Sequence, residues 1–121
     1  MQFDLGAFEI LFLLLAGHAV ADFGLQNEFI ARFKSHREQL NIGNTKHANL
    51  IWIHILMSHC LIHGLAVFLI LGNLWLALAE TVAHAITDFL KSEDRFGFHA
   101  DQFIHIACKF LWWIIWLALL N

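Results

Sequence analysis

Four long apolar runs, none of which contains proline, are the feature that most constrains how this 121-residue chain can fold. They cover about residues 3–23, 48–71, 73–90 and 101–120, and each is close to the ~20 residues that a helix needs to cross a bilayer. Hydrophobic residues make up 60% of the chain and charged residues 14%, which excludes an ordinary soluble domain. We therefore predict an all-α fold, an integral membrane four-helix bundle that forms a single transmembrane domain over residues 1–121.

The links between these runs differ in character. Residues 24–40 are polar and charged, and Leu25, Phe29 and Phe33 recur within them at four-residue spacing. This pattern predicts an amphipathic link on the cytoplasmic membrane surface, although it also fits a helical extension of the first run. The dipeptide at 72–73, Gly-Asn, predicts a tight turn between the second and third runs.

The basic residues predict how the chain is oriented. Six of the seven lie in the first and third links: Arg32, Lys34, Arg37, Lys46, Lys91 and Arg95. Cytoplasmic loops of membrane proteins are enriched in Lys and Arg, so we expect both links to be cytoplasmic and both termini to lie on the non-cytoplasmic side. The expected location is the inner membrane of a bacterium, for a protein that either the bacterium or a phage encodes.

Composition also limits the partners. The few basic residues form no broad basic surface, which argues against a nucleic-acid partner.

Cys60 and Cys108 lie in apolar runs without a CxxC pattern and are expected to be small buried hydrophobic residues. The first run lacks a basic segment before it and is interpreted as a retained helix, not a cleaved signal peptide. The main expected partner is the lipid bilayer, and a homo-oligomer is also compatible with the sequence.

Each apolar run carries one pair of ionisable residues four positions apart, which places both side chains on one face of a helix. The pairs are His18 and Asp22, His59 and His63, His84 and Asp88, and Asp101 and His105. A charged group at the bilayer centre costs roughly 2.5–3.5 kcal/mol, so these side chains should face the bundle interior and find partners there. A metal ion is the strongest available partner, since imidazole and carboxylate are natural metal ligands.

Eight candidate ligands are too many for one ion. They suit two divalent transition metal ions about 3.5–4 Å apart, such as zinc, iron or manganese. In the second run we rank His59 first, His63 second and His54 third as a ligand, and the sequence leaves this choice open. A metal-free proton path and a structural polar seam are the alternatives.

Four further polar residues fall beside these pairs. Glu80 precedes His84 by one helical turn, and Lys109 follows His105 by one turn. We predict catalytic roles for Glu80, as a proton-transfer group, and for Lys109, as a partner of carboxylates or of a substrate phosphate. Gln26 and Gln102 are candidate hydrogen-bond donors to the ligands.

Several motifs resemble those of a known family. "GHAVADFGLQ", "HCLIHG", "AHAITDFLK" and "DQFIHI" resemble, in this order, the small membrane proteins called domain of unknown function 3307. The chain is also distantly similar to the LexA-regulated, metal-dependent hydrolases of the inner membrane. The second resemblance implies that the metal ligands are His18, Asp22, His59, His84, Asp88, Asp101 and His105.

Three functions fit these observations. The leading hypothesis is a metal-dependent hydrolase that acts on a lipid or amphiphilic substrate near the cytoplasmic leaflet, with iron-dependent redox chemistry as a variant. A transporter or channel for protons or divalent metals is the second. It fits less well, because the outer halves of three runs are almost purely apolar. The third is a non-catalytic membrane subunit that contains a structural metal.

Overall fold

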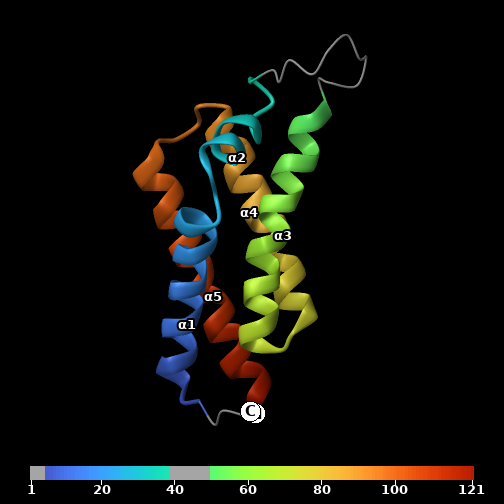
Figure 1. Ribbon diagram of the computed structural model, residues 1–121. Coiled ribbons are helices and arrows are strands. Elements are labelled where there is room, and N and C mark those ends of the chain that lie inside the picture. The colour runs from blue at the N-terminus through green and yellow to red at the C-terminus, as the bar shows by residue number, and fades with distance from the viewer. Residues whose placement is uncertain (1–4, 39–49) are drawn as a thin grey trace.

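The computed structural model describes residues 5–38 and 50–121, and within them the fold is all-helical. Four long helices lie side by side, and two short helical segments follow the first of them (Figure 1). The elements in chain order are α1 (Ala7–Ala19), the π-helical turn η1 (Val20–Gly24), α2 (Glu28–Phe33), α3 (Ile51–Leu71), α4 (Leu74–Ser92) and α5 (Phe98–Leu120). No strand occurs in these described residues.

The four long helices run up and down in turn. α1 packs against α3 and α5, and α4 packs against the same two helices, which closes the bundle. α1 begins and α5 ends at the same end of the bundle (Figure 1). Near this end the indole of Trp113 donates a hydrogen bond of 2.7 Å to the carbonyl of Ala7. The other end carries α2 and the α4–α5 connection, and we call it the link end.

Three of the helical segments are long and apolar enough to cross a membrane. They are Ala7–Gly24, Ile51–Leu71 and Phe98–Leu120. α4 has 19 residues but carries Glu80, Asp88 and Lys91, so its composition is more polar. A membrane location is therefore supported by three helices, while a fourth crossing and the sidedness of the termini stay predictions.

The helix boundaries differ in detail from those expected. The predicted starts at residues 3 and 48, and the end of the predicted link at residue 40, lie outside the described residues. The first run ends as a helix at Gly24, and α2 is a separate helix, capped by an Asn27 side chain that accepts a 2.9 Å hydrogen bond from the Ile30 amide. α4 extends to Ser92 and α5 begins at Phe98, because the polar ends of both helices continue past the apolar runs.

The turn between α3 and α4 uses the two residues that predict it. Gly72 caps α3 with φ of +64°, a left-handed conformation that glycine adopts without steric cost. The Asn73 side chain caps α4 by accepting a hydrogen bond of 3.1 Å from the Leu76 amide. Both caps satisfy backbone groups that helix ends would otherwise leave unpaired.

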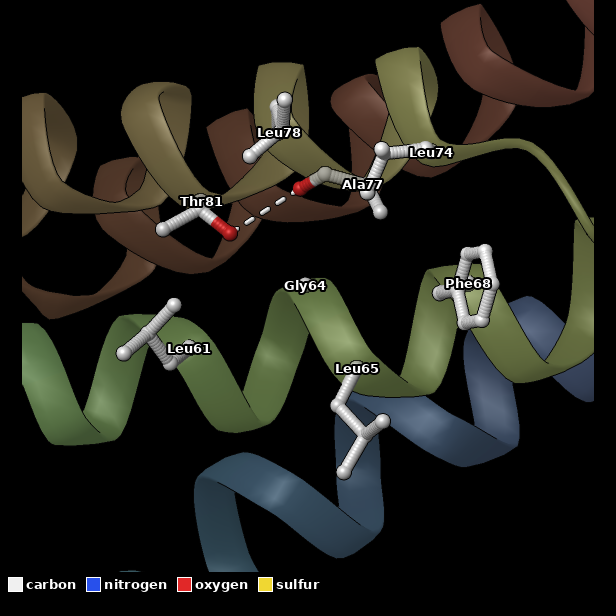
Figure 2. A pocket seen from close by; sticks show the side chains of 8 residues that line it. All are labelled: Leu61, Gly64, Leu65, Phe68, Leu74, Ala77, Leu78 and Thr81. Atoms are coloured by element: carbon white, nitrogen blue, oxygen red, sulfur yellow. Dashed lines mark hydrogen bonds between the residues drawn. The ribbon is translucent and has the colours of Figure 1, made fainter.

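Close approach of the backbones sets the α3–α4 interface. Gly64 on α3 faces Ala77 and Thr81 on α4, where the Thr81 hydroxyl donates a 2.9 Å hydrogen bond to the Ala77 carbonyl (Figure 2). A Cβ atom added to Gly64 would lie 2.1 Å from the Thr81 hydroxyl oxygen. Glycine at this position therefore allows the two helices to meet closely, a common device in membrane bundles.

The bundle interior is divided by polarity. Near the end where α1 begins, buried apolar side chains from all four long helices form one cluster: Ile10, Leu14, Val67, Leu71, Leu76 and Trp112. Toward the link end the buried side chains are instead ionisable. Many large apolar residues point outward, as expected of helices that face lipid, and among them Trp75 is 77% exposed.

Candidate metal centre

All eight predicted ligands lie inside the bundle. None is more than 7% exposed. α3, α4 and α5 contribute two each, while the fourth pair has His18 in α1 and Asp22 in η1: His59 and His63, His84 and Asp88, Asp101 and His105, His18 and Asp22. The pairing by helix follows from four-residue spacing, which repeats the same helix face. The position of the pairs at one depth is a result of how the helices pack.

A π-helical turn shapes the contribution of the first helix. The Leu25 amide donates to the Val20 carbonyl, five residues back, at 2.8 Å, so the turn is wider than an α-helical turn. Ala21 and Asp22 are both buried within it. Such turns are rare and occur often at functional sites, and this one carries a candidate ligand.

Six of the eight side chains form two overlapping groups whose donor atoms lie within 4.8 Å of one another: Asp22, His59, His63 and His84, and then His84, Asp88 and His105. In the first group, Asp22 Oδ1 is 3.4 Å from His59 Nε2 and 3.3 Å from His63 Nε2. His84 Nε2 is 3.2 Å from His59 Nε2. Three helices thus direct four donor atoms at one point.

Asp88 lies between the two groups. Its Oδ2 atom is 3.6 Å from His59 Nε2 and 3.7 Å from His84 Nε2, whereas its Oδ1 atom is 3.3 Å from His105 Nε2. Asp101 Oδ1 is also 3.3 Å from His105 Nε2 and so lies on the second side. One carboxylate therefore presents an oxygen to each group.

These separations match the coordination distances of metals. Zinc binds nitrogen and oxygen ligands at 2.0–2.1 Å, so neighbouring ligands around a tetrahedral ion lie roughly 3.4 Å apart. The donor atoms of Asp22, His59, His63 and His84 are separated by 3.2–3.8 Å where they face one another. The site therefore has the dimensions of a metal centre without rearrangement of the helices.

Unpaired ring nitrogens distinguish this site from an ordinary polar network. Neither nitrogen of His63 makes a hydrogen bond to another described residue, although the residue is 1% exposed. The 3.3 Å contact with Asp22 lacks the geometry of a hydrogen bond. Buried polar atoms in proteins are nearly always satisfied, so this buried imidazole could serve as a metal ligand.

His18 lies at the edge of the two groups. Its Nε2 atom is 3.2 Å from Gln102 Oε1 and 3.8 Å from Asp22 Oδ2. The amide nitrogen of Gln102 donates to Asp22 Oδ2 at 2.7 Å, so one glutamine orients both residues. Gln102 was expected to support the ligands, and the structure places it in that position.

Glu80 and Lys109 lie on the side of the site that is farther from the link end. Glu80 Oε1 is 3.5 Å from His84 Nδ1 and 2.5 Å from Lys109 Nζ, and Glu80 Oε2 accepts a 2.6 Å hydrogen bond from the Trp112 indole. Lys109 is 2% exposed. The structure therefore places Glu80 next to the candidate ligand His84, and Lys109 next to Glu80.

Two lysines border the site at the link end. Lys34 Nζ is 2.5 Å from Asp88 Oδ2 and 2.6 Å from Gln26 Oε1. Lys91 Nζ is 3.2 Å from Asp101 Oδ2. The sequence favours a role for these lysines in orienting the chain in the membrane, with a role at the site as the alternative. The sequence around a lysine in a link does not indicate which carboxylate the lysine contacts in the folded protein.

The other described histidines, His36, His54 and His99, lie away from the site, and His47 lies outside the described residues. His54 and His99 are exposed, and His36 stacks on Phe89 outside the bundle interior. His59 and His63 both enter the site, so α3 contributes two residues where the sequence left one to be chosen. Cys60 is buried and unpaired, as expected of a small hydrophobic residue.

A comparison with family models assigns the chain to a protein family. Residues 10–120 match the family described as "Protein of unknown function (DUF3307)". The chain belongs to this family. The match covers α3, α4 and α5, most of α1, and every predicted ligand.

No curated protein and no solved structure matches the chain. The distant similarity to the LexA-regulated hydrolases therefore stays a prediction. Any assignment of function depends on the site itself.

Proposed function

We propose that this protein is a membrane-embedded, metal-dependent hydrolase that acts on a lipid or amphiphilic substrate near the cytoplasmic leaflet. One observation carries the proposal. Six buried His and Asp side chains from η1, α3, α4 and α5 converge at metal-ligand distances, and the His63 ring makes no hydrogen bond within the described part of the chain. In a bundle that faces lipid, so many buried polar groups without a ligand would be costly.

The residues divide between two divalent ions, which we propose to be zinc, iron or manganese. Asp22, His59, His63 and His84 would hold the first ion. Asp101 and His105 would hold the second, and Asp88 would connect the two through its separate oxygens. Paired divalent ions activate water and polarise an ester or phosphoester bond.

Glu80 acts in this proposal as a positioning residue. A carboxylate beside Nδ1 fixes the imidazole tautomer and directs Nε2 toward the metal. His84 Nε2 is the atom that faces Asp22 and Asp88, while Nδ1 faces Glu80. Lys109 and Trp112 hold the Glu80 carboxylate from its other side.

The apolar cluster favours catalysis over transport. Beyond the Glu80–Lys109 pair, the interior of the bundle is filled by the buried side chains around Leu14 and Val67. A conduction path needs polar groups or water through this half as well. A polar centre that apolar packing closes off from the other half of the bundle suits an enzyme of one leaflet.

Elemental analysis tests the proposal. Purified wild-type protein in detergent is expected to hold about two equivalents of one transition metal, and the His84→Ala/Asp88→Ala variant is expected to lose them. The matched control is Asp94→Asn/His99→Ala, which removes one carboxylate and one imidazole that are both exposed. A folded wild-type protein that binds no metal after reconstitution would refute the proposal.

A further inference from the structure

We infer that the substrate is a lipid whose headgroup ends in a phosphate monoester, which Lys34 and Lys91 recognise at the link end of the metal centre. The inference rests on the proposed function and names the substrate class of the same site. Three observations carry it. They are the two lysines, the charge of the centre, and a mostly apolar groove whose lining includes His59.

The lysines come from different elements but face the same centre. Lys34 follows α2 and is 13% exposed, and Lys91 lies in the last turn of α4 and is 35% exposed. Each ammonium group contacts the carboxylate of a candidate ligand, Asp88 or Asp101. Divalent ions would neutralise these carboxylates and leave the two ammonium groups beside the metals without an equal anionic partner.

The charge of the loaded centre favours an anion. The carboxylates of Asp22, Asp88 and Asp101 and the two ammonium groups together carry a charge of −1, while Glu80 and Lys109 cancel. Two divalent ions change this charge to +3, and a single ion would change it to +1. An uncompensated charge is costly inside a bundle that faces lipid.

A phosphate monoester fits this charge better than a carboxylic ester does. It enters as a dianion with three oxygens that accept hydrogen bonds, and lysine is a common partner of phosphate in proteins. An uncharged ester would compensate none of the excess charge. The site therefore selects the phosphate end of a lipid rather than the esters of its acyl chains.

The groove provides a place for the hydrocarbon part. It encloses about 220 Å³ between α2 and α3, and its lining is mostly apolar: Phe29, Ile30, His54, Ile55, Ser58, His59 and Ile62. The same atom, Asp88 Oδ2, is 3.6 Å from His59 Nε2 and 2.5 Å from Lys34 Nζ. A chain lying in the groove would thus bring its headgroup to the ligands and to Lys34.

The reaction that follows is hydrolysis of the phosphate monoester. The oxygen of water bonds to phosphorus, and the bond between phosphorus and the lipid oxygen breaks with its electron pair going to that oxygen. One proton of the water ends on the lipid alcohol, and the other stays on the inorganic phosphate. No oxidant or further reactant is needed.

Binding of inorganic phosphate to the metal-loaded protein tests the role of the lysines. Isothermal titration in detergent is expected to show about tenfold weaker phosphate binding for Lys34→Gln and for Lys91→Gln, with metal content at least equal to wild type. Lys34→Arg should retain most of the affinity, because it keeps the charge. The matched control is Arg32→Gln, whose side chain is 63% exposed and pairs with Glu38.

Vesicles of phosphatidylcholine that contain phosphatidic acid test the substrate. The wild-type protein is expected to release inorganic phosphate and no fatty acid. Ser58→Trp, which fills the groove, should raise KM for phosphatidic acid but not for a soluble aryl phosphate. Its control is Met57→Trp, since Met57 borders a different groove, against α4.

The outcomes separate this inference from the proposed function. Metal-loaded protein that releases fatty acid, or binds phosphate equally well without Lys34 and Lys91, would overturn the inference and leave a metal-dependent hydrolase. Protein that binds no metal would refute both. Phosphate release that depends on both lysines and on the open groove would support both.

Discussion

At the scale of single residues, histidines on the same helix differ in their surroundings. His54 and His59 both belong to α3, but His54 is exposed whereas His59 is 1% exposed and lies 3.4 Å from Asp22. We expect His59→Ala to lower the metal content of the purified protein at least twofold, because it removes a donor atom from the first group. His54→Ala should leave the metal content unchanged. Equal metal content in the two variants would contradict the assignment of ligands.

The buried pair of Glu80 and Lys109 supports a second prediction. Glu80→Gln leaves the Lys109 ammonium buried without a counter-ion, which we expect to destabilise the protein by about 3–5 kcal/mol. Glu80→Gln/Lys109→Met removes both charges and should recover most of the thermal stability, measured as Tm in detergent.

The same double variant separates folding from metal binding. Glutamine is a weaker acceptor for His84 Nδ1 than a carboxylate, so metal affinity should stay about 10- to 100-fold below that of wild type even where Tm recovers. Recovery of both Tm and affinity would mean that Glu80 has no role at the metal.

At the scale of helices, the contact between α3 and α4 depends on Gly64. We expect Gly64→Ala to destabilise the bundle by about 1–3 kcal/mol, because the added Cβ atom would overlap the Thr81 hydroxyl and lie 2.9 Å from the Ala77 carbonyl. Thermal unfolding in detergent measures the change. Gly24→Ala is the control, since the nearest side-chain atom would be 3.9 Å away and should lower Tm less.

At the scale of the whole molecule, the number of membrane crossings decides which compartment the site faces. Four crossings would place residue 121 outside the cytoplasm and the α4–α5 connection inside it. We expect a membrane-impermeant maleimide to label Asn121→Cys in intact cells and Gly97→Cys only after permeabilisation, with Cys60 and Cys108 replaced by alanine. Gly97 is exposed and a side chain there meets no other atom within 4 Å, so the substitution should not disturb the fold. Labelling of both positions from one side would instead mean that α5 does not cross the membrane, and the reverse pattern, with Gly97→Cys outside and Asn121→Cys inside, would contradict four crossings.

The sequence alone determined the helical class of the protein and which residues could serve the site. Long apolar runs without proline can satisfy their backbone groups in a membrane only as helices or closed barrels, and runs near 20 residues favour helices. Four-residue spacing places His18 with Asp22, and His84 with Asp88, on one helix face whatever the helix packs against. These features are local along the chain, so they could be predicted.

Only the tertiary structure decided how those faces meet. No spacing in the sequence predicts the π-helical turn at Asp22. The entry of both His59 and His63 and the two-sided position of Asp88 depend on how the long helices pack. The contact between Lys34 and Asp88 joins residues 54 positions apart, a distance at which no spacing rule applies. Helix periodicity fixes the direction of a side chain about its own axis, but the depth and rotation of one helix against another follow from contacts such as the one at Gly64.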